Sequence, residues 1–236
     1  MLNIKTLSFN IHKGIGWGKY YFSLDQIQEQ LHTIEPDVVF LQEVRGHQFD
    51  HLKAGLWDHH CYGMNAIYQT GHHGNVILSK FPIVHINHLD LSVRRLDRKG
   101  MLHAIVSLPN NQKLHLLCIH LGLLFGDRNK QMNMIMKYMH INIPDHEPII
   151  MGGDFNDWKG HIAQPLITEL QLKEAFLHCR QAYAKSFPAW MPMFKLDRIY
   201  YRGFTASSAE KMTQPAWKYL SDHLALLVHF TLDNVP

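Results

Sequence analysis

Carboxylates and amides stand directly after apolar runs at several points of the chain. Glu43 follows the run VVFL at 38–41, and Asp154 and Asn156 follow the run PIIM at 148–151. A carboxylate at the end of a buried strand is costly in free energy unless it is paired, hydrogen-bonded or bound to a metal. Strand ends are also where a rigid scaffold presents catalytic groups. The pattern therefore indicates acid–base or metal chemistry at strand ends.

Further polar residues occupy similar positions. Asn10 stands in the first alternating segment, and His120 follows the apolar run at 114–119. Asp197 lies in the segment LDRI, while Asp222 and His223 lie in the segment SDH. We expect these side chains to converge on one site.

The elements that must position these residues follow from hydrophobic periodicity. Helices are predicted at 24–34, with Ser23 as the N-cap, and at 127–143 and 161–170. Strands are predicted at 4–11, 38–41, 61–68, 74–79, 101–108, 114–120, 148–151, 196–201, 204–207 and 224–232. Adjacent strands joined by short turns favour mixed sheets with helices packed outside them over a parallel βαβ ladder. The chain lacks repeats and linker-like segments, so we expect a single domain over residues 1–236.

Composition narrows the protein class. Hydrophobic residues make up 46% of the 236 residues and charged residues 18%, which excludes disorder and a fibrous architecture. No apolar run is long enough for a membrane-spanning helix, and the N-terminus alternates instead of forming a signal peptide. The three cysteines lack CxxC spacing, which fits a reducing compartment. We therefore expect a cytoplasmic protein. Its net charge of +3 does not identify a partner.

Seven sequence blocks in order resemble the endonuclease/exonuclease/phosphatase (DNase I-like) family of metal-dependent phosphoesterases. They are FNIHKG, LQEV, GNVILSKFPI, CIHLGL, GDFND, LDRIYYRG and SDHLALL. The segments RKGMLHA, at 98–104, and HLGL most resemble the bacterial YbhP-like branch. This resemblance implies an α/β (α+β) fold: a four-layer αββα sandwich, with two mixed, mostly antiparallel sheets packed face to face and helices outside.

The resemblance also implies roles in phosphoester cleavage, which needs a positioned water and neutralised charge. Glu43 and Asp222 would face Mg²⁺ or Mn²⁺, hard cations that prefer carboxylate oxygens. Asp154 would align or deprotonate the attacking water, and Asn156 would donate a hydrogen bond to the phosphoryl oxygens. Two structural alternatives remain open: a Glu43–Arg45 ion pair, and an Asx turn at the Asp-Phe-Asn segment.

The remaining polar residues would complete the site. His223 would contact the scissile phosphate, with Asp197 orienting its ring. Asn10 would hydrogen-bond Asp154 or the phosphate. His120 would lie beside the leaving oxygen, or be a hydrogen-bonded histidine of the core.

One position departs from the family pattern. Several nucleases of the family carry an acidic metal ligand two residues after the strand asparagine, where this chain has His12. A single ion is therefore expected, and His12 would contact substrate phosphate or have a structural role.

The substrate is not fixed by the sequence. Arg98, Arg128 and Arg45 would bind phosphates or be solvated surface residues. Two aromatic segments are expected beside the site, where they would stack on bases, enter a lipid surface or cover the core; they comprise Trp17, Tyr20, Tyr21 and Phe22, and Phe187, Trp190, Met191, Met193 and Phe194. We expect a monomeric nuclease acting on DNA. A phospholipid or inositol-phosphate phosphoesterase is the alternative, and a non-catalytic binding protein is a more remote one.

Overall fold

The computed structural model describes residues 2–17, 22–68, 71–95 and 97–233, whose strands form two six-stranded sheets. The first sheet has the order β11-β12-β1-β2-β4-β3, and the second has the order β5-β6-β7-β8-β10-β9. The strands of the first sheet are β1 (Asn3–Asn10), β2 (Val38–Arg45), β3 (His59–Tyr68), β4 (Gly71–Ser79), β11 (Phe204–Lys211) and β12 (Leu226–Leu232). Those of the second are β5 (Ile83–Asp90), β6 (Gly100–Ser107), β7 (Lys113–His120), β8 (Ile149–Asp154), β9 (Lys173–Glu174) and β10 (Asp197–Arg202).

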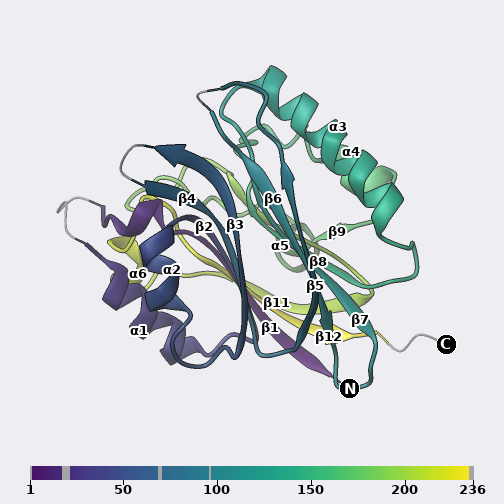
Figure 1. Cartoon of the computed structure of the whole chain (residues 1–236), viewed down its shortest axis with the longest axis horizontal. Helices are drawn as coiled ribbons and strands as arrows, with labels where there is room; N and C mark the ends of the chain where they lie inside the picture. The colour runs from purple at the N-terminus through teal and green to yellow at the C-terminus, as the bar shows by residue number, and fades with distance from the viewer. Residues whose placement is uncertain (1, 18–21, 69–70, 96, 234–236) are drawn as a thin grey trace.

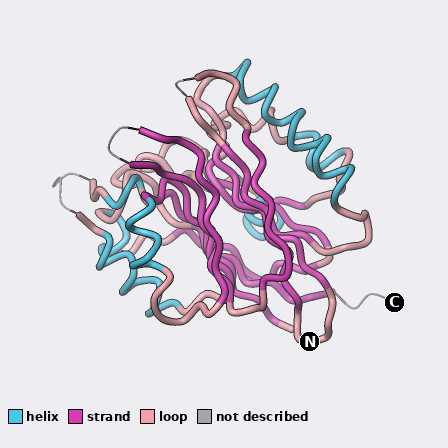
Figure 2. The backbone as a smooth tube through the Cα atoms, viewed as in Figure 1, coloured by secondary structure: helices cyan, strands magenta, loops and turns pink. Residues whose placement is uncertain are grey.

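The two sheets pack face to face, with helices on their outer faces (Figures 1 and 2). Helices α1 (Leu24–Ile34), α2 (Gly46–Leu52) and α6 (Pro215–Lys218) lie on the first sheet, while α3 (Phe125–Asn142) and α4 (Gln164–Thr168) lie on the second. Helix α5 (Ala175–Arg180) packs against β10 and β11. The β1–β2 and β7–β8 pairs are parallel, and the remaining neighbours are antiparallel. The predicted four-layer αββα sandwich is confirmed.

Three apolar clusters hold these layers together. Alternating residues of the central strands, such as Phe40, Leu116 and Phe230, fill the space between the sheets. The other side of the first sheet packs against Leu31 of α1, and that of the second packs against Ile135 of α3. The central strands read as continuous apolar runs because both of their faces are buried.

Some local predictions were wrong. The Ser23 side chain does not cap α1, because its hydroxyl donates instead to the carbonyl of Leu220 at 2.6 Å. The helix predicted at 161–170 is confined to Gln164–Thr168. Strand β5 was not predicted, because it is a largely exposed edge strand without a buried face to impose an apolar alternation.

Within the described ranges, no helix combines the length and apolarity that crossing a bilayer would require. All three cysteines are free thiols.

Candidate active site

The polar residues found in the sequence meet where central strands of both sheets end. In the second sheet, His120 on β7 pairs with Asp154 on β8, which in turn pairs with Asp197 on β10. From the first sheet, Asn10 ends β1 and Glu43 lies near the end of β2. The register of three neighbouring strands thus brings residues distant in sequence onto one edge.

A β-bulge aims Glu43 into the site. The β2–β4 register shifts between Leu41 and Val44, so that residues 42 and 43 lie outside the regular ladder. Glu43 has a φ of 59°, in a left-handed region that side chains other than glycine rarely adopt. Such strain, together with a bulge, is typical of functional sites, because it turns a side chain out of the alternation of its strand.

Two glycines allow Asp154 to reach its position. A Cβ at Gly153, where φ is 153°, would lie 1.9 Å from the carbonyl oxygen of Ile119 on the neighbouring strand. A Cβ at Gly152 would lie 2.6 Å from the ring of Phe40 in the opposing sheet. The Gly-Gly-Asp sequence therefore lets β8 lie close to both β7 and the first sheet.

Hydrogen bonds hold both carboxylate oxygens of Asp154. The amide of Asn10 donates to Oδ2 at 3.1 Å, and the backbone N–H of Asn156 donates to Oδ1 at 2.9 Å. Burial raises the pKa of Asp154 to about 6, although the charge of His223 opposes this shift. A carboxylate with a pKa this near neutrality suits a general base.

His223 is held by Asp197 on its other side. The His223 Nδ1 lies 2.8 Å from Asp197 Oδ2, and its Nε2 lies 3.8 Å from Asp154 Oδ2. Ser186 also donates a hydrogen bond to Asp197. Burial alone would lower the pKa of His223, but the nearby carboxylates, above all Asp197, raise it to about 10. His223 is therefore an imidazolium at neutral pH.

His120 has the opposite character. Burial and the charge of Lys99 lower its pKa well below the ordinary value, so the ring is neutral. The Lys99 ammonium lies 2.8 Å from His120 Nε2, which accepts its hydrogen bond. In this arrangement the ammonium, and not the imidazole, presents protons to the cavity.

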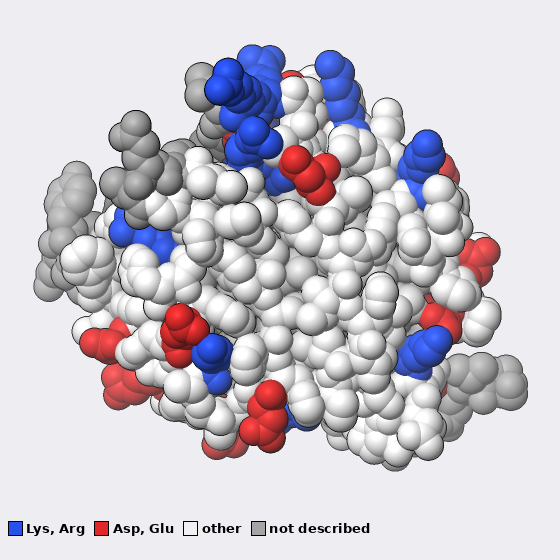
Figure 3. Space-filling view, in the orientation of Figure 1, with Lys and Arg blue, Asp and Glu red and all other residues white. Residues whose placement is uncertain are grey.

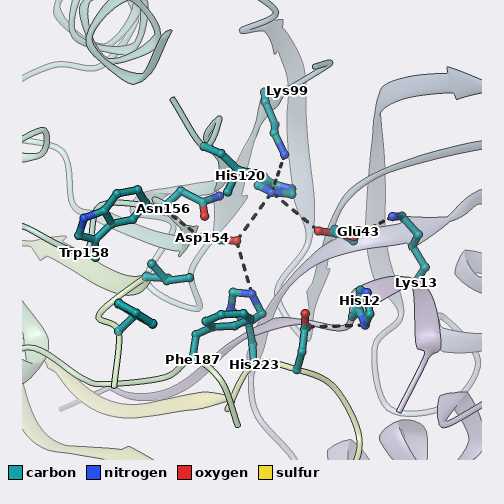
Figure 4. A pocket seen from close by; sticks show the side chains of 14 residues that line it. His12, Lys13, Glu43, Lys99, His120, Asp154, Asn156, Trp158, Phe187 and His223 are labelled. Carbon is teal, nitrogen blue, oxygen red and sulfur yellow. Dashed lines mark hydrogen bonds and ion pairs between the residues drawn. The ribbon is translucent and has the colours of Figure 1, made fainter. Parts of the chain in front are cut away.

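A cavity of about 500 Å³ opens over these residues (Figure 4). Besides the polar groups, apolar side chains line it and limit its solvation. The lining residues are His12, Lys13, Glu43, Lys99, His120, Leu123, Asp154, Asn156, Trp158, Phe187, Phe194, Leu196, Asp222 and His223.

The donor set fits a hard cation with an open coordination sphere. Burial alone would raise the pKa of Glu43, but the nearby ammonium groups of Lys13 and Lys99 hold it below the ordinary value, so the carboxylate is ionised. Among the described residues, no three His, Cys, Asp or Glu side chains form a ready metal cluster. Mg²⁺ needs only one or two carboxylates and keeps several waters, which Glu43 at a solvent-accessible cavity can accommodate.

Comparison with known proteins agrees with this architecture. The profile of the Endonuclease/Exonuclease/phosphatase family matches residues 7–223. The chain belongs to this family. The matched region runs from β1 to His223, so it contains both sheets' contributions to the cavity.

Individual relatives share the whole fold. The YbhP protein of Escherichia coli (strain K12) is 35% identical over 240 residues, covering 95% of this chain and 94% of YbhP. A family structure from Bacteroides vulgatus aligns with a TM-score of 0.84 and 17% identity, covering 99% of this chain and all of that one. The human Nocturnin catalytic domain, solved with a bound sulfate anion, aligns with a TM-score of 0.81 and 19% identity over 98% of this chain and 94% of its own.

Several residues expected to contact substrate do not line this cavity: Arg45, Arg98, Arg128, Trp17 and Trp190. Arg128 is buried and donates to the carbonyls of Gly122 and Leu123, so its guanidinium stabilises a turn. Arg98 is exposed, and its guanidinium donates to the carbonyl of Arg95.

The two tryptophans expected at the site are half-exposed instead. The backbone N–H of Trp17 donates to Tyr219, and Trp190 lies between the cavity residues Phe187 and Phe194. Of the first aromatic segment, Tyr20 and Tyr21 lie outside the described residues, and Phe22 is exposed away from the cavity lining.

Two lysines belong to the cavity but were not predicted. Lys13 lies 3.4 Å from Glu43, where the predicted alternative partner was Arg45. Lys99 precedes Gly100, whose strand partner is His120. A predicted pairing of β6 with β7 would have indicated that Lys99 lies beside His120. The position of Lys13 depends on a turn, which hydrophobic periodicity does not reveal.

Proposed function

We propose that this protein is a divalent-metal-dependent phosphoesterase that uses a water positioned by Asp154. The observation that carries the proposal is the Asp197–His223–Asp154 arrangement, which sets a charged imidazolium 3.8 Å from a carboxylate of raised pKa. His223 thereby supplies a cation for the phosphoryl oxygens, and Asp154 supplies a base for the attacking water beside it.

Each side chain has a distinct task in this proposal. Asp154 orients the attacking water and accepts its proton at a carboxylate oxygen, while Asn10 keeps that carboxylate in place. His223 hydrogen-bonds the scissile phosphate, and Asp197 fixes its ring. Lys99 donates toward the leaving oxygen, and His120 holds the ammonium there.

The proposal also assigns residues to the metal. Glu43 would hold Mg²⁺ or Mn²⁺, with Asp222 facing the ion or the attacking water, and the ion would neutralise charge on the phosphoryl oxygens. Asp222 Oδ1 lies 3.7 Å from His12 Nδ1, and both residues line the cavity, which supports a contact of His12 with the same phosphate. Asn156 lines the cavity and retains one amide proton for a phosphoryl oxygen, because the other is donated to Leu121.

DNA is the first candidate substrate. Lys13, Lys99 and the imidazolium of His223 give the cavity a cationic side that suits a phosphodiester backbone. The exposed Trp158 at its rim offers a surface on which a base can stack.

A phospholipid is the second candidate, favoured by exposed apolar residues beside the cavity. Leu123 and Phe194 line the cavity, and their loops continue into other exposed apolar side chains: Leu124, Phe125, Trp190, Met191 and Met193. Figure 3 shows Lys and Arg side chains gathered where the segment between β5 and β6 lies near the start of α3. Apolar and basic residues together are typical of surfaces that contact anionic lipids.

A hydrolysis panel tests the proposed function. The substrates are plasmid DNA, an abasic-site duplex, single-stranded DNA, RNA, bis-p-nitrophenyl phosphate, sphingomyelin and inositol phosphates, each with Mg²⁺, Mn²⁺ or EDTA. We expect hydrolysis that EDTA abolishes and that Asp154→Asn lowers at least a thousandfold, consistent with loss of a general base. Substantial activity in Asp154→Asn, or in EDTA, would refute the assignment. Liposome-dependent turnover with intact DNA would favour the lipid candidate.

A further inference from the structure

A second cavity, of about 480 Å³, lies beside the catalytic one and is lined largely by basic residues. Among the residues that the structure describes, its lining consists of Lys13, Arg45, Gly46, His47, Gly71, His72 and His73, none of which carries a carboxylate. Lys13 lines both cavities, so the two are adjacent. A concave site with several cationic or N–H donors and no acidic residue is complementary to an anion.

The backbone around this cavity is held in place by one buried side chain. Gln48 of α2 donates to the carbonyl of Lys13 at 2.7 Å and accepts from the backbone N–H of Arg45 at 2.9 Å. Lys13 has a φ of 57°, which is unusual for a lysine. One amide thus fixes two cationic residues from separate segments, and a strained backbone is maintained at the point where the cavities meet.

The imidazole of His72 is fixed in a similar way. Its Nδ1 lies 2.8 Å from the hydroxyl of Tyr62, and a Cβ at Gly46 would lie 2.3 Å from its ring. The absence of a side chain at Gly46 therefore makes room for this ring at the cavity. Arg45 and His73 are paired across β2 and β4, which places their side chains as neighbours.

The guanidinium of Arg45 is available to bind a ligand in this cavity. Arg45 makes no ion pair with any residue that the structure describes, and its guanidinium is always charged. Glu43, the carboxylate that contacts Lys13, lines the catalytic cavity and not this one. A planar guanidinium with free donors can bind a phosphate through two hydrogen bonds.

We propose that this second cavity binds a non-scissile phosphate of the substrate, so that the enzyme selects phosphoesters carrying at least two phosphate groups. The proposal rests on the proposed function, because it assumes that the scissile phosphate occupies the neighbouring catalytic cavity. Lys13 lies between the two phosphates, while Arg45 and His47 contact only the second. An oligonucleotide and an inositol polyphosphate both offer this chemistry.

The test compares substrates that differ in their number of phosphates. Values of kcat/KM are measured for bis-p-nitrophenyl phosphate, a short DNA oligonucleotide and an inositol bisphosphate in the wild type, Arg45→Gln, His47→Glu and a control, Lys137→Glu. Lys137 is exposed on α3, away from both cavities. We expect the ratio of multi-phosphate to single-phosphate kcat/KM to fall about tenfold or more in the Arg45 and His47 variants, and to stay unchanged in the control.

The outcomes separate the two sources of phosphate. A ratio that falls only for the oligonucleotide identifies a nucleic acid as the source, and a fall only for the inositol bisphosphate identifies a polyphosphorylated small molecule. If both variants lower kcat/KM equally for all substrates, or change it for none, the proposal of a second phosphate site is overturned. His47 is exposed, so its variant remains informative if Arg45→Gln fails to fold.

Binding measurements distinguish failure of this site from failure of the proposed function. Fluorescence anisotropy of a labelled oligonucleotide and competition by inositol bisphosphate are measured in EDTA. If the wild type hydrolyses nothing, the proposed function fails, yet a tenfold loss of affinity confined to Arg45→Gln and His47→Glu still supports an anion site. Unchanged affinity for both ligands in both variants refutes it.

Discussion

Replacing Asp197 by Asn should change the pH dependence of catalysis and not merely its rate. Asp197 is the main source of the opposing charge that raises the pKa of the buried His223 to about 10. The Asn side chain keeps the shape and can still bond Ser186, but it carries no charge. Without that charge, burial should lower the pKa of His223 toward the ordinary value of about 6.5, against the remaining charges of Asp154 and Asp222.

The size of the effect follows from the protonated fraction of His223. In the wild type the imidazolium is almost fully populated at pH 8, because its pKa is about 10. With a pKa of about 6.5, only about 3% is charged at pH 8, but about 75% is charged at pH 6. Hence kcat/KM of Asp197→Asn should fall by up to about 30-fold at pH 8 and by less than about twofold at pH 6, beyond any pH-independent loss.

The assay is a profile of kcat/KM for bis-p-nitrophenyl phosphate between pH 6 and 9 at saturating Mg²⁺. Asp157→Asn is the matched control, since Asp157 is another buried carboxylate, which accepts hydrogen bonds from Gly160 and Ile162 outside the catalytic cavity. The Asp157→Asn variant should be less stable than the wild type, but its kcat/KM should not fall at alkaline pH relative to the wild type. An equal loss at pH 6 and pH 8 in a folded Asp197→Asn protein would refute the role of the imidazolium.

Three further predictions concern the metal, the leaving group and acid stability. Glu43→Gln should raise the Mg²⁺ concentration needed for half-maximal activity at least tenfold, and a metal titration with unchanged midpoint would contradict this. Lys99→Ala should lower kcat about a hundredfold, whereas Lys130→Ala, at an exposed position on α3, should not; equal rates would exclude a role for the Lys99 ammonium. His103, hydrogen-bonded to His115 at 2.9 Å, has a pKa lowered to about 3, chiefly by burial. Because the unfolded chain binds this proton first, stability should fall as pH drops below about 6.5, by about 2 kcal/mol between pH 7 and pH 5. Urea unfolding at pH 7 and pH 5 should show that His103→Gln loses about 2 kcal/mol less stability than the wild type over this pH interval. An identical loss of stability in both proteins would contradict the prediction.

Much of the fold was predictable because the central strands form continuous apolar runs in the sequence. Runs such as those of β2 and β8 are apolar on both faces, since each lies between the other sheet and a helix layer. Edge elements were harder to predict. Strand β5 is mostly exposed, and short helices such as α2 and α5 lack the length to show a period.

The sequence by itself determined which residue types stand at the ends of the central strands: Glu43, His120 and Asp154 follow apolar runs, whereas Asn10 ends an alternating segment and Asp197 begins a strand. Only the tertiary structure decided which side chains enter the cavity. Strand register, the bulge at Glu43 and the turn that carries Lys13 set those directions. Arg128, which has the chemistry of a phosphate ligand, is instead buried, and its Nη1 donates to backbone carbonyls. Residue type limits what a side chain can do, but long-range packing fixes where it points, and packing depends on contacts between segments that local sequence does not encode.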